Sequence, residues 1–348
     1  MNIFTVVLKR LTRIGKILSS INWVTFLRLY HSDAQIIMWI PNTSLKYFGT
    51  DAFLWDMATL SSLVLERKAF KIVYGKGIGK YHNKKIFYTI SHHYNVYKFD
   101  DSTTVLVYIA QQLELQGNTV FPKSRETIFW ENKAHMHEAF DHAKVNIPHT
   151  KIYKSYEALL NSYLSYPFLV KAEHSCASEG VYKINSFKEL KHLMQEEHFA
   201  AKNKNIIVQE LINMRKDLRV ILSKDEILLY YWRINPDKEW KPTSTSYGSQ
   251  VDFDYFPEQW REHILKTFKS LNLTTGAFDI TWQNDDLSTE PIYLEVSPYY
   301  QPNPKMDTHG KSYAFYKQHF TPFHCWDVKY VDIVFEIKHK QVQAYLAN

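Results

Sequence analysis

Cysteine is scarce in this chain: only Cys176 and Cys325 occur in 348 residues, and they lie far apart. A disulfide framework and a zinc knuckle both need cysteines that are more numerous and more closely spaced, so we expect neither. Such sparing use of cysteine is typical of a reducing environment, and we expect a cytoplasmic protein.

Long apolar runs and strong net charge are also missing. No apolar stretch is long enough to cross a bilayer, and basic residues interrupt the first apolar segment, so a secretory signal is not expected. The formal net charge is only +6. A charge so weak and diffuse suits anionic small molecules or an acidic membrane face, and it predicts no nucleic acid partner.

The N-terminal segment, residues 1–30, has the spacing of an amphipathic helix. Its apolar face carries Val7, Leu11, Ile14, Leu18 and Ile21, and its basic face carries Lys9, Arg13 and Lys16. A basic amphipathic helix can lie on an anionic membrane, which would make residues 1–28 a peripheral contact at the inner membrane face. The alternative is a helix that packs on its own domain or on the second copy of a homodimer.

Strands and helices alternate over residues 31–128, which predicts a small open α/β lobe. The expected strands are 35–40, 70–74 and 84–90, and the expected helices are 51–67 and 103–116. The run Gly75-Lys-Gly-Ile-Gly79 resembles a phosphate loop, but no helical pattern follows it. We therefore expect a glycine turn that joins its flanking strands as a hairpin.

Two α+β subdomains are expected next, at residues 129–205 and 206–348, the second including a C-terminal tail. The expected elements of the first are helices 132–143 and 186–197 and strands 167–171 and 180–184. Those of the second are strands 206–212, 217–222 and 227–233 and helix 257–271. A last pair of strands follows this helix.

Two acidic residues in this last pair of strands are the most informative feature of the chain. Asp279 ends Gly-Ala-Phe-Asp, and Glu295 stands in Leu-Glu-Val-Ser-Pro after a polar segment, 283–289. Two short strands joined by a tight turn would place the carboxylates side by side. Converging carboxylates repel unless a cation or a shared proton lies between them, and Mg²⁺ prefers hard oxygen ligands. The alternative is a solvated hairpin with ordinary surface acids.

Groups that suit a nucleotide occur in the segments before this pair. Lys171 ends a strand ahead of a loop of small residues, 172–179, whose backbone N–H groups could fold over phosphates. Strand 206–212 could offer backbone edges to a purine. Arg233 suits a carboxylate or a phosphoryl group, because its guanidinium is a permanently charged fork.

In order and spacing these segments resemble the ATP-grasp superfamily, and within it the carboxylate–amine ligases such as glutathione synthetases, D-alanine–D-alanine ligases and ribosomal-protein glutamate ligases. The resemblance covers roughly residues 131–304. The matching motifs are Asn132-Lys133, Pro167-Phe-Leu-Val-Lys171, Glu179-Gly-Val181, Val208-Gln-Glu-Leu-Ile212, Asp217-Leu-Arg219, Trp232-Arg233, Gly276-Ala-Phe-Asp279 and Leu294-Glu-Val-Ser-Pro298. It implies an ATP-grasp fold of mixed α/β class, in which an N-terminal lobe precedes two subdomains that grip ATP.

The resemblance also implies which residues bind the nucleotide. Lys133 and Lys171, with Gly180 in the loop, would bind the phosphates of ATP, Gln209, Glu210 and Leu211 would contact adenine, and Asp217 would contact the ribose. Segment 240–248 stands where relatives place an Arg and an Asn near the phosphates, and Lys241 or Thr243 would substitute there.

Metal and substrate residues follow from the same resemblance. Asp279, Glu295 and Ser297 would hold Mg²⁺ or Mn²⁺, and Arg219 and Arg233 would face the substrate carboxylate and its acylphosphate. The chain departs from the family at Glu295-Val-Ser297, where relatives carry Glu-x-Asn, and Asn303 is the alternative ligand. It departs again in the phosphate loop, which keeps only one glycine.

Other candidate groups have simpler explanations. Cys176 lies in the phosphate loop, but no His and Asp arrangement accompanies it, so a small loop residue is expected there. His135, His137 and His142 share one helix, but the first two point to different faces and predict no metal cluster.

The function implied is an ADP-forming ligase that joins a carboxylate to an amine through an acylphosphate. Its substrates would be an amino acid and a small molecule or a cell-envelope sugar acid. A binding protein with a degenerate nucleotide site and no turnover is the alternative, motivated by Ser297 and the glycine-poor loop.

Overall fold

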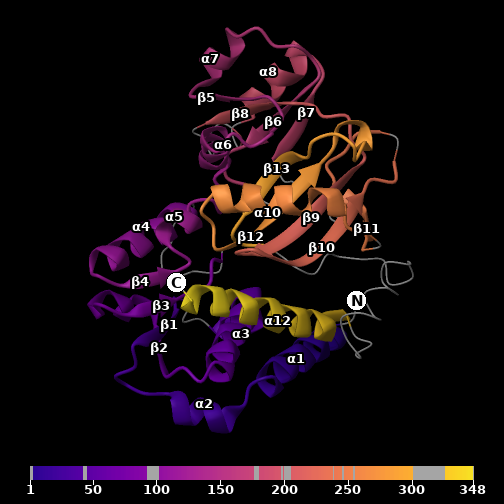
Figure 1. The fold of residues 1–348 in the computed structure, drawn as a ribbon. Coiled ribbons are helices and arrows are strands. Elements are labelled where there is room, and N and C mark those ends of the chain that lie inside the picture. Colours follow the sequence, from indigo (N-terminus) through magenta and orange to yellow (C-terminus); the bar gives the residue numbers. More distant parts are fainter. Residues whose placement is uncertain are drawn as a thin grey trace. The chain divides into compact units, whose positions relative to one another are not determined.

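The computed structural model describes residues 3–41, 45–91, 102–175, 180–196, 199, 205–237, 239–244, 247–253, 255–300 and 326–347. They divide into two compact units. Unit 1 contains the described residues up to Ile128 together with the C-terminal helix, and unit 2 spans Phe129–Tyr300. Figure 1 shows the elements of both units.

A four-stranded parallel sheet forms the centre of unit 1. Its strands are β1 (Ile36–Ile40), β2 (Phe70–Tyr74), β3 (Lys85–Phe87) and β4 (Thr119–Phe121), in the order β2-β1-β3-β4. Helix α3 (Asp51–Leu65) joins β1 to β2, and α4 (Ser102–Leu115) precedes β4. The connection from β1 to β2 and the connection from β3 to β4 lead toward opposite edges of the sheet. Because crossovers between parallel strands are right-handed, α3 and α4 cover opposite faces of the sheet.

The glycine run was predicted wrongly. Residues Gly75–Lys80 form a 3-10 helix, η2, and the strands before and after it both pair with β1, in parallel. Strand β1 is buried at all five positions, and it therefore takes the centre of the sheet, where two neighbours cover its edges. The connection through η2 consequently crosses β1 and forms no hairpin.

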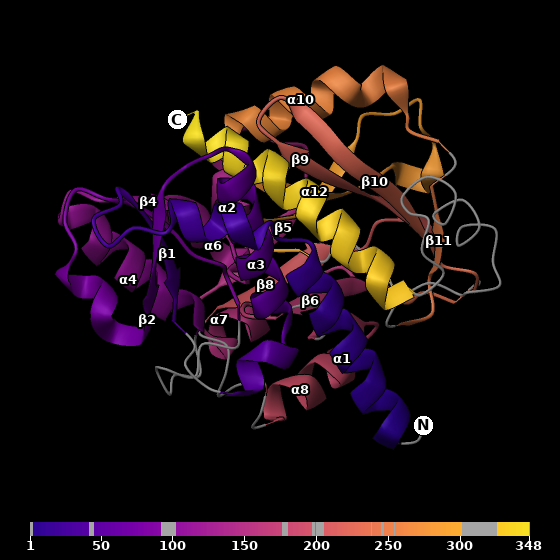
Figure 2. The same cartoon turned by 90° about the horizontal axis from the view of Figure 1, so that it is seen from below.

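Unit 1 also contains α1 (Ile3–Ser19), α2 (Trp23–Leu29) and α12 (Trp326–Leu346). Helix α12 packs along α3 and beside α1, as Figure 2 shows. Side chains of α3 are consequently buried from Ala52 to Val64. The sequence analysis placed this C-terminal segment with residues 206–300, but buried Ile333, Val334 and Ile337 give α12 an apolar face in unit 1. The 3-10 helix η1 (Leu45–Gly49) and the short helix α5 (Ser124–Thr127) also belong to this unit.

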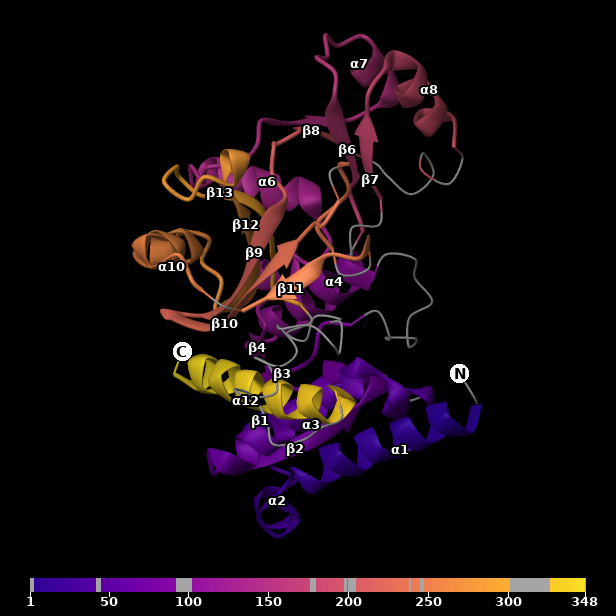
Figure 3. The same cartoon turned by 90° about the vertical axis from the view of Figure 1, so that its right-hand side faces the viewer.

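Unit 2 is built on two antiparallel sheets, which Figure 3 shows in side view. The first has the order β5-β8-β6-β7, from β5 (Thr150–Tyr153), β6 (Phe168–Ala172), β7 (Val181–Ile184) and β8 (Ile206–Glu210). Helices α7 (Tyr156–Leu160) and α8 (Phe187–Gln195) accompany it, and Leu159, Leu190 and Leu193 join Val170 in its buried core.

The second sheet has the order β11-β10-β9-β12-β13. Its strands are β9 (Lys216–Ser223), β10 (Glu226–Ile234), β11 (Gln250–Asp252), β12 (Thr275–Thr281) and β13 (Ile292–Ser297). Helix α10 (Arg261–Ser270), which follows the 3-10 helix η4 (Glu258–Trp260), buries Ile264 and Phe268. Helix α6 (Lys133–His142) lies against β13, where Val296 N–H donates to the sulfur of Met136 at 3.3 Å. The elements predicted from 132 to 271 agree with the observed ones to within a few residues.

Within the described ranges, no helix is both long and apolar enough to span a membrane.

Candidate functional site

The two carboxylates singled out in the sequence lie opposite each other. Asp279 of β12 pairs with Glu295 of β13, and the register shifts just after this pair. The turn between the strands contains the 3-10 helix η5 (Gln283–Asp285), in which Asn284 has a positive φ of 58°. The predicted adjacency of these two residues is therefore confirmed.

Asp279 belongs to a network of four alternating charges. Its carboxylate accepts bonds from Arg219 Nε at 2.7 Å and Nη2 at 2.8 Å, and from Arg233 Nη2 at 2.8 Å. Arg233 in turn donates to Asp217 through Nε at 2.8 Å and Nη2 at 2.5 Å, and the hydroxyl of Thr243 donates to the same carboxylate at 2.8 Å. Bidentate pairs of this kind are strong and directional.

Strand geometry explains why these four charges meet. Asp217 and Arg219 are two residues apart on β9 and therefore share one face of the sheet. Asp279 lies opposite Arg219 on β12, and Arg233 lies opposite Asp217 on β10. Cross-strand neighbours of opposite charge stabilise each other, so the Asp-Leu-Arg spacing on one strand determines the whole network.

Burial and charge act in opposite directions on Asp279. Burial alone would raise the pKa of this carboxyl, but Arg219 and Arg233 outweigh it and hold the pKa well below its usual range. Burial alone would lower the pKa of Arg219, but Asp279, Tyr231 and Glu295 together outweigh it and raise the pKa well above its usual value. Both arginines predicted to face a substrate are therefore engaged by protein carboxylates in this structure.

Glu295 differs from Asp279. Its side chain is partly exposed and lines the pocket, and within the described part of the chain its carboxylate has no hydrogen-bond partner. Ser297, the third predicted metal ligand, does not line the pocket, and its hydroxyl donates to the carbonyl of Tyr299 at 2.6 Å. Glu295 is thus the carboxylate best placed for a cation, and Asn303 lies outside the described residues.

Two lysines reach the same pocket from other elements. Lys133 of α6 is 6% exposed, and its Nζ donates to the carbonyl of Ser175 at 2.6 Å and to the Ser175 hydroxyl at 3.0 Å. Burial lowers the pKa of Lys171 on β6 to about 8, an effect to which Lys133 adds and which Glu295 and Asp279 oppose. Among the described residues, the Lys171 ammonium has these two carboxylates as opposite charges, but it makes no direct ion pair with either.

One buried histidine lies near this pair of lysines. His137, one helical turn after Lys133, is 3% exposed, and neither ring nitrogen has a hydrogen-bond partner in the described structure. Burial, with the charges of Lys171 and Lys133, lowers its pKa to about 3, so the imidazole is neutral. The neutral ring therefore adds no positive charge beside the two lysines.

Gly180 approaches the end of β6 closely through its backbone. This residue has φ of +73°, its carbonyl accepts from Ala172 N–H at 2.8 Å, and a Cβ at this position would lie 2.6 Å from the Cβ of Ala172. Only glycine fits both conditions. Residues 176–179, which include Cys176, lie outside the described residues.

The far end of the pocket is less charged. Gln209 is buried and its Nε2 donates to Thr150 Oγ1 at 2.9 Å, while Glu210 pairs with the backbone of His149. After β8 ends at Glu210, the N–H and C=O of Leu211 make no backbone hydrogen bond with described residues. An unpaired donor and acceptor beside apolar side chains suit the edge of a purine.

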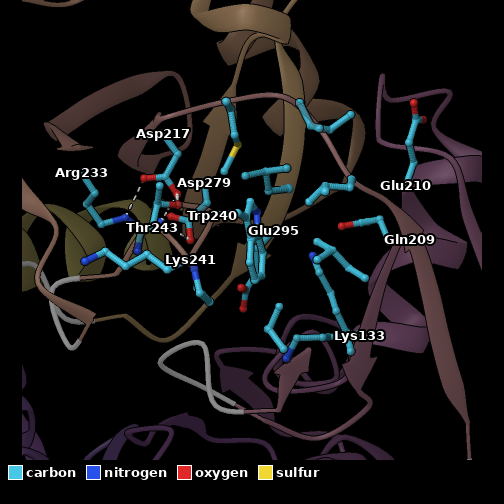
Figure 4. Close-up of a pocket in the computed structure, with 18 of the residues that line it drawn as sticks. Lys133, Gln209, Glu210, Asp217, Arg233, Trp240, Lys241, Thr243, Asp279 and Glu295 are labelled. Carbon is cyan, nitrogen blue, oxygen red and sulfur yellow. Dashed lines mark hydrogen bonds and ion pairs between the residues drawn. The ribbon is translucent and has the colours of Figure 1, made fainter. Parts of the chain in front are cut away.

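Most of these groups line one pocket of unit 2 (Figure 4). The volume of this pocket is about 770 Å³, including the space at its open mouth. Arg233, Asp217, Asp279 and Thr243 gather at one end in the figure, Gln209 and Glu210 lie at the other, and Glu295 lies between. Lys241 lines it too and pairs with Asp237, whereas Ser297 and Arg219 do not line it.

Several lining residues were not predicted. They are the apolar Leu169, Val181, Ile212, Met214 and Leu294, together with Trp240 and Pro242. Strand alternation provides a signal for some of them, since Leu169 and Lys171 are two residues apart on β6 and therefore share a face. Met214 and Trp240 stand in loops, where no periodicity indicates the direction of a side chain.

The residues present fit a nucleotide with its cation. Lys171 and the anchored Lys133 suit phosphate oxygens. Glu295, whose carboxylate accepts no hydrogen bond among the described residues, supplies the one carboxylate that Mg²⁺ needs when phosphates provide further ligands. Asp279 contributes less, because three bonds from arginine already occupy its oxygens. No cluster of three or more His, Cys, Asp and Glu residues able to hold a metal occurs within the described ranges.

Comparison with known proteins identifies the fold. No family model and no curated protein matches the sequence. Solved structures do match: D-alanyl-alanine synthetase A from Vibrio cholerae has a TM-score of 0.56 at 13% identity, covering 90% of this chain and 98% of its own. D-alanine–D-alanine ligase from Bacillus anthracis, complexed with ATP, has a TM-score of 0.54 at 12% identity, over 90% of this chain and 99% of its own.

A third structure similar to this chain is a RimK domain ATP-grasp protein from Sphaerobacter thermophilus. Its TM-score is 0.52 at 10% identity, with 87% of this chain and 98% of its own covered. At such identities the likeness concerns the fold. The mixed α/β fold predicted from the sequence motifs is confirmed.

Proposed function

We propose that this chain, which has the ATP-grasp fold, is an ADP-forming ligase that joins a carboxylate to an amine. The observation that carries the proposal is the meeting of Lys133, Lys171 and Glu295 in one pocket, beside the exposed backbone edge of Leu211. These residues come from α6, β6, β13 and the end of β8. Together they match the charges and the flat apolar base of ATP.

The residues of the pocket have separate tasks in this proposal. Lys133 and Lys171 bind phosphates, and Gly180 lets the adjoining loop approach them. Leu211 offers its backbone to adenine between the apolar side chains of Leu169 and Leu294. Gln209 and Glu210 hold the end of β8 against β5, so we assign them to positioning this edge.

Glu295, with a secondary contribution from Asp279, would hold Mg²⁺ or Mn²⁺. When bound, the cation neutralises phosphate charge during transfer. We leave Ser297 out of this set because its hydroxyl is used by Tyr299. Asp217, predicted to contact ribose, is fully engaged by Arg233 and Thr243, so we assign it to holding Arg233 in place.

The reaction proposed has two steps. An oxygen of the substrate carboxylate attacks the γ-phosphorus of ATP, and ADP leaves with the electron pair of the broken P–O bond. The amine then attacks the acyl carbon of the resulting acylphosphate, inorganic phosphate leaves, and the amine gives up a proton. Lys171 and Arg233 stabilise the charge on the transferring group, and the pocket supplies orientation.

Among the structures similar to this chain are ligases for D-alanine, by their names. An amino acid as one substrate is therefore part of the proposal, with a small molecule or a cell-envelope sugar acid as the other. The cytoplasmic setting and the homodimer expected from the sequence stay predictions.

The test is a turnover assay on the full chain with ATP, Mg²⁺ and a panel of carboxylates and amines. ADP and phosphate should be released only when a carboxylate and an amine are both present. Lys171→Met and Glu295→Gln should each abolish this release, whereas Lys151→Met, at an exposed lysine of β5 outside the pocket, should not. AMP as the product would overturn the acylphosphate route. ATP binding without turnover would favour a degenerate binding protein. The observation that supports this alternative is Asp279, because bonds from Arg219 and Arg233 already occupy the oxygens that a metal ion would need.

A further inference from the structure

The first two helices of unit 1 present an apolar surface to solvent. We name it the α1–α2 surface, and its side chains are between 37% and 72% exposed: Leu8, Leu11, Leu18, Trp23, Val24 and Leu27. Figure 3 shows α1 and α2 as consecutive helices at the edge of unit 1. Isolated exposed leucines are ordinary, but six large apolar side chains on two adjoining helices are not.

Packing of α1 on its own unit uses only part of the apolar face. Ile17 and Ile21 are 1% and 4% exposed, and Arg13 pairs with Asp51 of α3. Leu11 and Leu18, predicted to share a face with Ile21, are 60% and 37% exposed. The two alternatives considered for this helix are therefore compatible, because one edge packs inward and the other remains available.

The surface is firmly attached to the unit. Trp23 donates from its indole to the carbonyl of Leu18 at 2.9 Å, and its ring lies 5.1 Å from that of Phe26. Phe26 in turn packs edge-on against Phe70 of β2 at 4.9 Å, and Asn22 caps α2 through a bond from Thr25 N–H. Docking on these helices would therefore orient the whole of unit 1.

The charged residues within α1 and α2 are all basic, and one of them, Arg13, pairs with Asp51 of α3. Residues 3–30 contain five basic residues and no acidic one: Lys9, Arg10, Arg13, Lys16 and Arg28. Arg28 is exposed on α2. A second copy of the chain is a poor occupant, since a two-fold contact would bring these cations against their own copies. An anionic surface attracts them instead.

We propose that the α1–α2 surface docks on the face of an anionic lipid bilayer. Leucine, valine and tryptophan side chains enter the boundary between headgroups and acyl chains, and basic side chains contact lipid phosphates. Trp23 fits this boundary because its indole is apolar with one polar edge. The proposal does not depend on the ligase activity, because it concerns unit 1 alone.

The test is flotation of the full-length protein with lipid vesicles. One vesicle type contains only phosphatidylcholine, and the other contains one third phosphatidylglycerol. The wild type should float with the anionic vesicles and remain behind with the neutral ones. Removing two leucines with Leu11→Ser and Leu27→Ser should weaken partitioning on the order of 100-fold, from about tenfold for each leucine.

A matched control uses two leucines of similar exposure outside the surface. Leu65 and Leu115 end α3 and α4 and are 65% and 80% exposed, so Leu65→Ser with Leu115→Ser should leave partitioning unchanged. Arg28→Gln should weaken binding to anionic vesicles about fivefold. Unfolding midpoints and ATP binding establish that each variant is folded.

Three results would overturn the proposal. They are equal flotation of the wild type with neutral and anionic vesicles, equal loss in the Leu65/Leu115 control, and a wild-type dimer that the Leu11/Leu27 variant dissociates while neither protein floats. The last result would assign the surface to a second copy of the chain, and light scattering measures it.

Discussion

Asp279 and Glu295 occupy opposed positions on β12 and β13, but their carboxylates differ in state. Asp279 accepts three hydrogen bonds from Arg219 and Arg233, whereas Glu295 has no hydrogen-bond partner among the described residues. The same backbone pairing therefore carries one structural carboxylate and one that is available to a ligand.

Removing each carboxyl charge should separate these roles. Glu295→Gln should change the free energy of unfolding by less than about 1 kcal/mol and lower turnover by at least on the order of 100-fold, because it removes a charge-stabilising group. Asp279→Asn leaves Arg219 and Arg233 short of a buried partner, and it should cost about 3–5 kcal/mol. Urea titration and ADP release measure the two quantities. Equal stability losses would contradict this assignment.

The affinity for ATP should depend on pH through Lys171. Its pKa is lowered to about 8 by burial, so the charged form that phosphate needs is lost as the pH rises through 8. Affinity should fall by up to about tenfold per pH unit above that value. Titration calorimetry between pH 7 and 9.5 measures it. Lys171→Arg, which stays charged, should show no such fall, and a parallel fall in both proteins would assign the effect to another group.

Gly180 should not tolerate a side chain. Gly180→Ala places a methyl group 2.6 Å from Ala172 Cβ at a positive φ, and we expect a loss of about 1–3 kcal/mol in stability together with weaker ATP binding. Gly79→Ala is the matched control, because no atom lies within 4 Å of its added Cβ and its φ is not positive. Thermal unfolding with and without ATP distinguishes the two. A neutral Gly180→Ala would show that the loop can rearrange.

A buried acid in unit 1 should make stability depend on pH. Burial raises the pKa of Asp56 from 3.8 to about 7, although a hydrogen bond from the Tyr47 hydroxyl and the charge of Lys338 lower it. The folded state then binds more protons than the unfolded state between these values, so the free energy of unfolding should fall as the pH rises from 4 to 7. Denaturation across this range measures the slope. Asp56→Asn should flatten it, and an unchanged slope would contradict the role of Asp56.

Local pattern predicted much of unit 2. The alternation on β9, β10 and β12 and the spacing of Asp217, Arg219 and Asp279 located these strands and placed the charges on shared faces. The partners of those charges could not be predicted in the same way. Whether Arg233 faces a substrate or Asp217 depends on strand order, which follows from contacts distant in the sequence.

Unit 1 was harder to predict for the same reason. The run Gly75–Lys80 reads locally as a turn, and only the central place of β1 between β2 and β3 shows that the chain crosses over. Helix α12 is likewise assigned to unit 1 by its burial against α3, a contact between residues nearly three hundred positions apart, which no periodicity reveals.

The position of α12 has a consequence for synthesis on the ribosome. Helix α3 is translated well before α12, so its buried face is covered only when α12 has been translated and has left the exit tunnel. Unit 2, which is encoded between them, has all its strands available sooner. Unit 2 can therefore reach its native state first, while the apolar face of α3 stays uncovered until α12 has been synthesised, and a chaperone that shields this face would act in this interval.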